Sequence, residues 1–308
     1  MVIAITGGSG FIGKELAKYY IQQGDRVRLL SRSPPSKSIN AQHFLGDLTD
    51  QDIDLSDFVK DVDILYHCAG EINNESLMQE VHVKGTQRLI DAAQGKIARW
   101  VQLSSVGAYG ACRDGVITEN SKEQPFGVYE QTKTESDNIV KNSGIQYVIL
   151  RPSNVFGLAM SNQSLFQLIK IVKKNLFFYI GRPGAFVNYV HVNDVVKSLI
   201  LCGINNNALG NTFIISQTIK IEQMIGSFRY GTKFTRDPFR LPEWLVRNFL
   251  NFLNFLNISL PLTISRVDAI TGHCRYDTTK LINILGFEFD SSLGEKFTNF
   301  SLSSPHEG

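Results

Sequence analysis

A glycine-rich run at the start of the chain constrains its fold more than any other feature. The apolar segment 2–5 leads into Thr6-Gly7-Gly8-Ser9-Gly10-Phe11-Ile12-Gly13, and a helical pattern follows over 14–23. Glycines at 7, 10 and 13 let a chain turn tightly, approach a pyrophosphate and pack a helix on a sheet. The helix N-terminus offers N–H groups and partial positive charge to that anion. The run therefore predicts a dinucleotide-binding unit, with contacts from Gly7, Gly10, Phe11, Ile12 and Gly13.

Strands and helices alternate through the first 150 residues. Further strands are expected at 26–30, 64–68, 100–104 and 146–150, and helices at 79–94 and 128–142. Such alternation predicts a parallel sheet that is covered by helices on both faces. We therefore expect an α/β fold, a Rossmann-type doubly wound parallel sheet, with a smaller and mostly helical C-terminal region that binds the substrate.

The pattern becomes less regular after Arg151-Pro152, which suggests a division of the chain. We expect residues 1–152 to form the dinucleotide-binding domain, with 186–216 returning to it. The substrate-binding region then comprises 153–185 and 217–300. The polar tail 301–308 is expected to be disordered.

Composition limits the partners and the compartment. The chain is 43% hydrophobic and 19% charged, with a net charge of +2, so nucleic acid is not expected as a partner. Its four cysteines, Cys68, Cys112, Cys202 and Cys274, form no CxxC pair. We therefore expect free buried thiols, no disulfide and no metal site, which fits a reducing cytoplasm. No signal-peptide pattern precedes the first strand.

One apolar stretch, Trp244 to Leu260, leaves two interpretations open. Asparagine recurs in it at every third position from Asn248 to Asn257, and the stretch is shorter than a membrane span requires. We favour a helix packed on the substrate side or at a subunit interface. Peripheral membrane contact is the alternative.

The end of the second strand bears on the choice of dinucleotide. An acidic residue there would bond the ribose 2′-hydroxyl of NAD, but this chain has Ser31-Arg32. A guanidinium suits a 2′-phosphate, because it can form charge-assisted hydrogen bonds. The sequence therefore favours NADP(H) over NAD(H). Alternatively, Arg32 is a solvated loop residue or stacks on the adenine.

A tyrosine and a lysine four residues apart, Tyr129 and Lys133, indicate a proton-transfer site. This spacing places both side chains on one helix face. A neighbouring ammonium lowers the pKa of a phenol, so Tyr129 could exchange a proton with a substrate hydroxyl. Lys133 would also reach the nicotinamide ribose. Ser105, at the end of the strand 100–104, would hold the substrate oxygen by a hydrogen bond.

Together these motifs resemble the extended short-chain dehydrogenase/reductases, the NAD-dependent epimerase/dehydratase family. The matching segments are TGxxGxxG at 6–13, the acidic-Leu pair Asp47-Leu48, HxAG at 67–70, SSxxxYG at 104–110, YxxxK at 129–133, RPxNVxG at 151–157 and HVxDV at 191–195. The resemblance implies adenine-side contacts from Asp47 and Leu48, further cofactor contacts from Ala69 and Gly70, and the role of active-site Ser/Thr for Ser105. It also implies a homodimer formed through 79–94 and 128–142.

One departure from the family pattern concerns His82. The family's NVxGT segment carries an asparagine where this chain has His82. A catalytic acid and a packed, hydrogen-bonded histidine are both compatible with that position, and we favour the second.

The resemblance implies a nucleotide sugar as substrate. We expect 4-keto reduction or C4 epimerisation, in the synthesis of surface-polysaccharide precursors. Dehydration ranks lowest, because Val106-Gly107 replace the Asp-Glu pair that follows the active-site threonine in dehydratases. Candidate contacts for the substrate diphosphate are Asn154, Asn188, Arg182, Arg266 and Arg275. Arg266 and Arg275 could form a phosphate clamp, or either could be a surface cation.

Two other functions stay open. The family's 3β-hydroxysteroid dehydrogenase relatives act on sterols or lipids, and Trp244–Leu260 could supply an apolar wall. A non-catalytic dinucleotide-binding sensor would keep the glycine run, but such proteins normally lose the tyrosine or the lysine.

Overall fold

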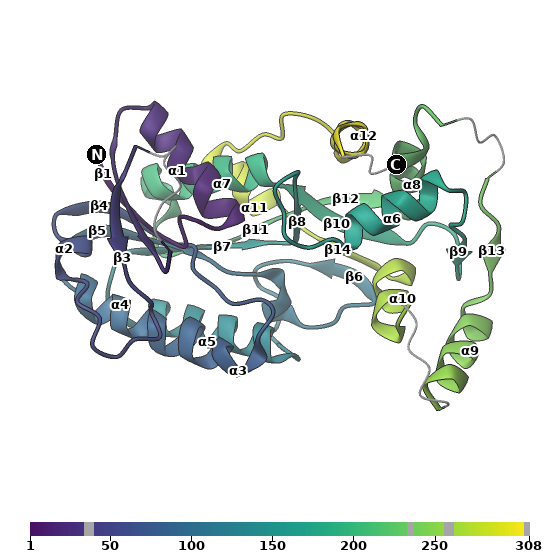
Figure 1. Cartoon of the computed structure of the whole chain (residues 1–308), viewed down its shortest axis with the longest axis horizontal. Helices are drawn as coiled ribbons and strands as arrows, with labels where there is room; N and C mark the ends of the chain where they lie inside the picture. The colour runs from purple at the N-terminus through teal and green to yellow at the C-terminus, as the bar shows by residue number, and fades with distance from the viewer. Residues whose placement is uncertain (34–39, 233–236, 256–261, 305–308) are drawn as a thin grey trace.

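The computed structural model describes residues 1–33, 40–232, 237–255 and 262–304. Within this part of the chain, seven parallel strands form the central sheet in the order β11-β7-β5-β4-β1-β2-β3 (Figure 1). Their bounds are β1 Val2–Thr6, β2 Arg26–Ser31, β3 Gln42–Leu45, β4 Val62–His67, β5 Ile97–Leu103, β7 Tyr147–Pro152 and β11 Thr212–Ile215. The strand order reverses between β1 and β4, as in a doubly wound sheet. The predicted α/β fold class is confirmed.

Helices cover both faces of the central sheet (Figure 1). One face carries α1 (Phe11–Gln22), α7 (Val192–Ile204) and α11 (Thr279–Leu285); the other carries α2 (Ser56–Val59), α3 (Glu75–Met78), the π-helical turn η1 (Gln79–Lys84), α4 (Gly85–Ala93) and α5 (Val128–Asn142). Every residue of β1 is buried, because both faces of the strand meet helices. Leu16 and Leu199 belong to the core on one face, and Leu89 and Val140 to the core on the other.

Smaller sheets and helices form the other end of the molecule (Figure 1). The strand groups are β8 (Asn154–Phe156) with β10 (Phe186–His191) and β12 (Gln217–Lys220), β9 (Tyr179–Ile180) with β13 (Arg240–Leu241), and β6 (Asp114–Ile117) with β14 (His273–Tyr276). The helices at this end are α6 (Ser164–Lys173), α8 (Ile221–Arg229), α9 (Glu243–Phe255), α10 (Ile264–Thr271) and α12 (Leu293–Ser303). Two short turns contact helices of the central sheet instead: η2 (Val106–Tyr109) contacts α5, and η3 (Asn206–Ala208) contacts α7 and α11. Phe156, Phe228 and Phe297 are buried together in the core of this end.

Two segments bear on the expected division of the chain. The segment 186–216, expected to return to the dinucleotide-binding domain, includes β11, which pairs with β7 at the edge of the central sheet. The preceding strand, β10, instead pairs with β8 and β12 outside that sheet. The two-domain division itself stays a prediction.

The expected disordered tail begins as part of a helix. α12 continues to Ser303, and both Ser301 and Ser304 are buried. The apolar spacing of Leu293, Phe297 and Phe300 places one face of this helix in the core, which holds its last turn in place. The prediction of disorder is therefore wrong for 301–304, and 305–308 lie outside the described residues.

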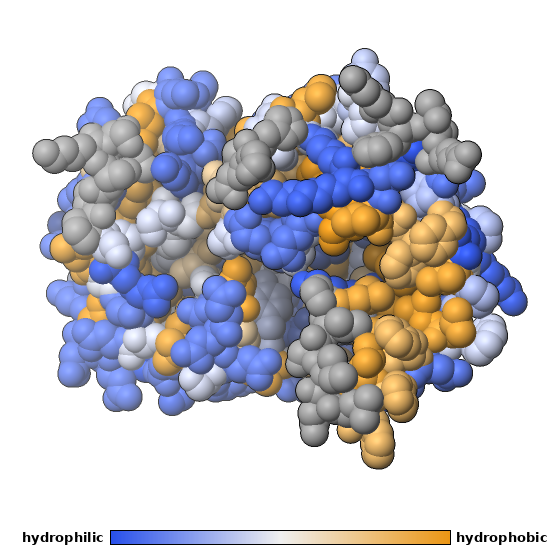
Figure 2. Space-filling view, turned by 45° about the vertical axis from the view of Figure 1, so that its right-hand side comes forward, coloured by the Kyte–Doolittle hydropathy of each residue, from blue (hydrophilic) through white to orange (hydrophobic). Residues whose placement is uncertain are grey.

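The apolar stretch near residue 250 forms α9. Val246 and Leu250 pack with Ile180 and Val267, whereas Phe252 and Phe255 on the outer side are 58% and 82% exposed. Figure 2 shows apolar side chains gathered on this side of the molecule. In the described ranges, no helix is both long enough and apolar enough to span a bilayer. The last residues of the stretch, from 256 on, lie outside the described residues.

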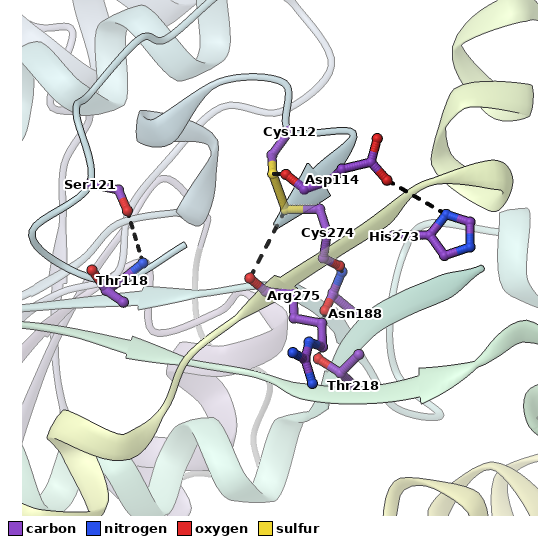
Figure 3. Close-up of a disulfide and its surroundings, with 9 residues drawn as sticks. All are labelled: Cys112, Asp114, Thr118, Ser121, Asn188, Thr218, His273, Cys274 and Arg275. Carbon is purple, nitrogen blue, oxygen red and sulfur yellow. Dashed lines mark hydrogen bonds and ion pairs between the residues drawn. A yellow bond between two sulfur atoms is a disulfide. The ribbon is translucent and has the colours of Figure 1, made fainter. Parts of the chain in front are cut away.

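A disulfide joins Cys112 and Cys274 (Figure 3). The two residues are 162 positions apart, but β14 pairs in parallel with β6 and places Cys274 opposite Gly115. The prediction that no disulfide forms is therefore wrong, because pairing between distant strands cannot be read from cysteine spacing. Cys68 and Cys202 are free, as expected. The disulfide also removes the sequence argument for a reducing compartment.

Candidate active site

A cleft runs along the carboxyl ends of the central strands. A smaller part of about 170 Å³ and a larger part of about 1040 Å³ share Gly7, Gly10 and residues 68–70 as lining. The two parts therefore meet at the loops after β1 and β4. Open parallel sheets bind ligands at this point, where the strand order reverses.

The loop after β1 has the shape that the glycine run predicted. Gly7 has a φ of 67°, and a side chain there would lie 2.8 Å from the backbone nitrogen of Ala69. A side chain at Gly13 would collide with the carbonyl oxygen of Gly7. Gly10 precedes α1 without a side-chain cap, and Phe11, Ile12 and Gly13 line the larger part of the cleft. This cradle fits the pyrophosphate of a dinucleotide.

The smaller part of the cleft is lined by several of the residues expected to contact the cofactor. Its lining includes Arg32, Asp47, Leu48, Ala69 and Gly70. Hydrogen bonds from the N–H of Asn73 and its neighbours lower the pKa of Glu71, and Arg32 adds to this effect. The Glu71 carboxylate therefore accepts hydrogen bonds from backbone N–H groups of the residues that follow it. Among the described residues that line this part, Arg32 is the one cation.

The structure brings Ser105, Tyr129 and Lys133 together in the larger part of the cleft. Ser105 follows β5, and its Oγ accepts a hydrogen bond of 3.1 Å from the N–H of Gly107. Tyr129 and Lys133 lie one turn apart near the start of α5. The Lys133 Nζ donates a 2.6 Å hydrogen bond to the carbonyl oxygen of Leu103, the last residue of β5. The strand β5 and the helix α5 thus position all three groups beside the glycine loop.

The electrostatics of Tyr129 differ from the expectation. Burial raises the pKa of Tyr129 to about 12, and the carboxylates of Glu130 and Asp137 add to this effect. Burial also lowers the pKa of Lys133, whose ammonium was expected to favour the phenolate. Desolvation is the largest effect on the pKa of Tyr129 in this structure. The phenol is therefore protonated near neutral pH and can act as a proton donor.

A buried ion pair beneath these residues was not predicted. Asp137, one turn after Lys133, accepts hydrogen bonds from Ser104 Oγ at 2.7 Å and from Arg151 Nη2 at 2.8 Å. Asp137 is 0% exposed and Arg151 is 1% exposed. The pair ties α5 to the ends of β5 and β7. Its sequence signal is the four-residue spacing from Lys133 to Asp137, which places both on one helix face.

His82 is a hydrogen-bonded packing residue, the interpretation favoured from the sequence. Its Nε2 accepts a 2.9 Å hydrogen bond from the N–H of Glu71, so Nδ1 carries the proton and donates to Thr132 Oγ1 at 2.8 Å. The imidazole also packs edge-on against the ring of Tyr129. Burial, with Lys133 nearby, lowers the pKa of His82 to about 3. His82 therefore stays neutral and connects the loop after β4 to α5.

Of the two asparagines expected to contact the substrate, one lines the cleft and the other is bonded within the protein. Asn154 lines the larger part of the cleft, and its Nδ2 donates to the carbonyl oxygen of Asn188 at 3.1 Å. The amide of Asn188 is engaged in structure: Nδ2 donates to Cys274 O at 2.9 Å, and Oδ1 accepts from Thr218 Oγ1 at 2.7 Å (Figure 3). Asn188 thus links β10 to β12 and β14.

The arginines predicted to hold the substrate are not part of the described cleft lining that includes Asn154. Arg275 is exposed on β14 and lies over the ring of Phe186. Neither Arg266 nor Arg275 belongs to the described lining of the cleft, and Arg182 lines a separate cavity with Arg113 and Trp244. A diphosphate role for these arginines stays a prediction.

Several lining residues were missed because no motif marks them. They are Glu130, Ser153, the segment 160–165 and Tyr189. Ser153 stands between Pro152 and Asn154 of the RPxNVxG segment, so its neighbours were the available signal. Its buried Oγ has no hydrogen-bond partner in the described part of the chain.

Over the same ranges, no group of three or more His, Cys, Asp or Glu side chains is arranged to hold a metal ion.

Comparison with known proteins agrees with this geometry. The sequence model of the NAD dependent epimerase/dehydratase family matches residues 3–215. The chain is 27% identical over 211 residues to the 4-hydroxy-2-methyl-3-oxo-4-farnesyl-3,4-dihydroquinoline-1-oxide ketoreductase of Stigmatella aurantiaca, a match that covers 64% of this chain and 63% of that protein. It is 27% identical over 221 residues to the putative UDP-glucose 4-epimerase of Methanocaldococcus jannaschii, covering 65% and 72%. The match to the ketoreductase thus spans less than two thirds of that relative's length.

The fold is also seen in solved structures. MoeE5 in complex with UDP-glucose and NAD superposes with a TM-score of 0.74 at 20% identity, over 98% of this chain and 97% of that one. At this identity the likeness concerns the fold.

Proposed function

Because the chain belongs to the NAD-dependent epimerase/dehydratase family, we propose that it is a nicotinamide-dependent oxidoreductase or epimerase that acts on a nucleotide sugar. The observation that carries the proposal is the convergence of Ser105, Tyr129 and Lys133 beside the glycine loop, in one cleft. The dinucleotide supplies the hydride donor or acceptor when it is bound. The protein supplies binding, orientation and the proton.

Each group of the set has a distinct task in this proposal. Ser105 holds the substrate oxygen by a hydrogen bond, and Tyr129 Oη exchanges a proton with that oxygen. Lys133, anchored on Leu103 O, contacts the cofactor ribose and adds positive charge near the phenol. Since burial raises the pKa of Tyr129 to about 12, the phenol is protonated near neutral pH and can give its proton to the carbonyl oxygen of a 4-keto sugar.

The proposed substrate class rests on the cleft and on relatives. Asn154 offers an amide beside the catalytic set, and the Methanocaldococcus relative is described as a putative UDP-glucose 4-epimerase. MoeE5, with the same fold, binds UDP-glucose and NAD. We place the reaction in the synthesis of surface-polysaccharide precursors, and we keep the preference for NADP(H) because Arg32 is the cation at the adenine end.

An oxidoreductase that acts on a lipid or sterol is the second candidate. The Stigmatella relative is a ketoreductase whose named substrate carries a farnesyl chain. In the present cleft, Phe156, Met160 and Leu165 give the substrate side an apolar wall. Such a wall suits a hydrocarbon chain as well as it suits a sugar ring.

A thermal-shift panel in the presence of cofactor separates the two candidates. UDP-, dTDP- and GDP-sugars are compared with sterols and prenylated ketones. A ligand at 100 times its dissociation constant stabilises the folded state by about 2.7 kcal/mol, which gives a readily measured shift. We expect stabilisation by at least one nucleotide sugar. Stabilisation by sterols or prenylated ketones alone would contradict the proposal.

We further infer a homodimer in which the segment 79–94, which includes α4, and the helix α5 pair with their copies. The two helices pack side by side on one face of the central sheet, where a second pair would complete a four-helix arrangement. Light scattering at micromolar concentration should give twice the mass of the chain. A monomer under these conditions would contradict the inference.

A further inference from the structure

The outer side of α9 exposes large apolar side chains that no described part of the chain covers. Leu245, Phe249 and Phe252 follow one another at helical spacing and are 43%, 56% and 58% exposed. Trp244 and Phe255 stand beside this row and are 65% and 82% exposed. Residues three or four positions apart lie on one side of a helix. The five side chains therefore form one apolar surface, which we call the α9 face.

The opposite side of α9 holds the helix on the protein. Val246 and Leu250 are buried with Ile180 of β9, and Phe178 packs against the same cluster. The exposed ring of Phe239 stacks on Phe178, with ring centroids 5.5 Å apart. Packing on one side thus fixes α9, while its aromatic side faces solvent. Figure 2 shows apolar residues gathered on the side of the molecule that carries this helix.

Cations dominate the segment that packs beside α9. The chain from 164 to 182 carries Lys170, Lys173, Lys174 and Arg182 and no carboxylate. This segment forms α6 and β9, and β9 supplies the core under α9. Lys170, Lys174 and Arg182 are exposed. A basic surface therefore adjoins the α9 face.

The carboxylates at α9 do not offset this positive charge. Glu243 forms ion pairs with Arg113 at 2.5 Å and with Arg247 at 2.8 Å. Arg247 also pairs with Asp268. Two arginines thus match these two carboxylates, and the cations of 164–182 are left as surplus positive charge.

A cavity of about 530 Å³ joins the basic surface to the α9 face, because Arg182 and Trp244 both line it. The guanidinium of Arg182 forms no hydrogen bond or ion pair with the described residues. Asp114, which also lines the cavity, lies 3.7 Å from the Nδ1 of His273. Guanidinium groups bind phosphates through charge-assisted hydrogen bonds. An anionic headgroup therefore fits at Arg182, next to the indole of Trp244.

We propose that the α9 face binds an anionic lipid surface. The aromatic side chains enter the headgroup region, and the cations of 164–182 contact lipid phosphates. A helix with Trp, Phe and Leu on one side and cations nearby has the features of a segment that lies on a bilayer. A bilayer also accepts a projecting row of side chains without a matching groove. The inference is independent of the proposed reaction, because the residues assigned to catalysis take no part in it.

The test measures flotation of the full chain with lipid vesicles. Vesicles of phosphatidylcholine mixed with phosphatidylglycerol are compared with vesicles of phosphatidylcholine alone. One variant removes the apolar side chains of the face, and a second removes two cations: Phe249→Ala/Phe252→Ala/Phe255→Ala and Lys174→Gln/Arg182→Gln. Matched controls change exposed residues elsewhere: Leu45→Ala/Phe126→Ala/Leu302→Ala and Lys60→Gln/Lys122→Gln.

The parent should bind the anionic vesicles at least about tenfold more tightly than the neutral ones, and added salt should weaken this binding. Each variant of the α9 face or of the basic surface should bind the anionic vesicles at least about tenfold more weakly than the parent. The control variants should bind like the parent. A parent that does not bind anionic vesicles would overturn the proposal, and so would equal losses in the controls.

The fluorescence of Trp244 reports on the α9 face without altering it. The chain has two tryptophans, and the other, Trp100, is 0% exposed. Anionic vesicles should shift the emission to shorter wavelength and protect it from acrylamide, and Trp244→Phe should abolish both changes. Vesicle binding without these changes would place the lipid contact elsewhere and overturn the assignment. A parent dimer that becomes a monomer in the triple aromatic variant would instead assign the face to a second copy of the chain.

Discussion

Tyr129 and Lys133 lie one turn apart on α5, and the ammonium of Lys133 is held by the carbonyl oxygen of Leu103 at 2.6 Å. The strand β5 therefore fixes the lysine, while the phenol of Tyr129 is protonated and lines the same cleft. Asp137, one further turn along, anchors the helix through Arg151. The contacts with Leu103 and Arg151 thus hold α5 in place, and Tyr129, one turn before Lys133, lines the cleft.

Replacing His82 by glutamine should reduce the loss of stability in acid. The pKa of His82 falls from 6.5 to about 3 on folding, because burial disfavours the charged ring. Between these two pH values the imidazole of His82 binds a proton in the unfolded chain but not in the folded chain. The contribution of His82 to the free energy of unfolding is therefore present above pH 6.5 and is lost as the pH falls toward 3. Glutamine can bond Glu71 N–H and Thr132 Oγ1 without titrating.

The measurement for His82 is urea unfolding at neutral pH and near pH 4. The glutamine variant should lose less stability than the parent between the two conditions. His82→Phe is the control that removes both hydrogen bonds, and it should be less stable by about 1–3 kcal/mol at neutral pH. Equal acid losses in the parent and in the glutamine variant would show that the imidazole does not titrate as described.

Replacing Arg32 by alanine should weaken NADP(H) and leave NAD(H) nearly unchanged. Loss of a charge-assisted bond to the 2′-phosphate costs about 1.5–3 kcal/mol, which corresponds to roughly 10–100-fold in affinity. Affinities for both dinucleotides are measured for the parent, for Arg32→Ala and for Arg26→Ala. Arg26 is exposed at the opposite end of β2 and serves as the control. A parent with equal affinity for the two dinucleotides would rule out the preference.

Removing the disulfide should destabilise the protein. The Cys112–Cys274 bridge closes a loop of 162 residues, and loss of such a crosslink costs about 2–5 kcal/mol. Unfolding by urea is compared with and without dithiothreitol for the parent and for the Cys112→Ser/Cys274→Ser double variant. Reductant should destabilise the parent and leave the double variant unaffected. Four reactive thiols in the unreduced, denatured parent would show that the bridge does not form.

The glycine run and the order of strands and helices predicted the central fold well, because both are local patterns. The cradle at Gly7 and Gly13 depends on backbone conformation within a few residues. The Tyr129–Lys133 pair could also be predicted from the sequence, since helical spacing alone places both side chains on one face.

Features that depend on pairing between distant segments could not be predicted from the sequence. The disulfide follows from the register of β6 against β14, and the engagement of Asn188 follows from its contacts with Thr218 and Cys274. The pKa of Tyr129 depends on how completely the tertiary structure buries it, so the spacing to Lys133 suggested the wrong direction. Glu130 was overlooked as a lining residue although it stands inside the YxxxK segment, because that pattern leaves the residue at this position open.

In the proposed reaction Tyr129 exchanges the proton while other residues bind the cofactor, and one comparison of variants tests this division of roles most directly. Turnover and dinucleotide affinity are measured for the parent, for Tyr129→Phe and for Tyr230→Phe, which alters an exposed phenol. Tyr129→Phe should lower kcat by about 10²–10⁴-fold or more, the range expected for a lost general acid. Its dinucleotide affinity should stay close to that of the parent, and Tyr230→Phe should match the parent in both. Turnover that survives in Tyr129→Phe would contradict the account.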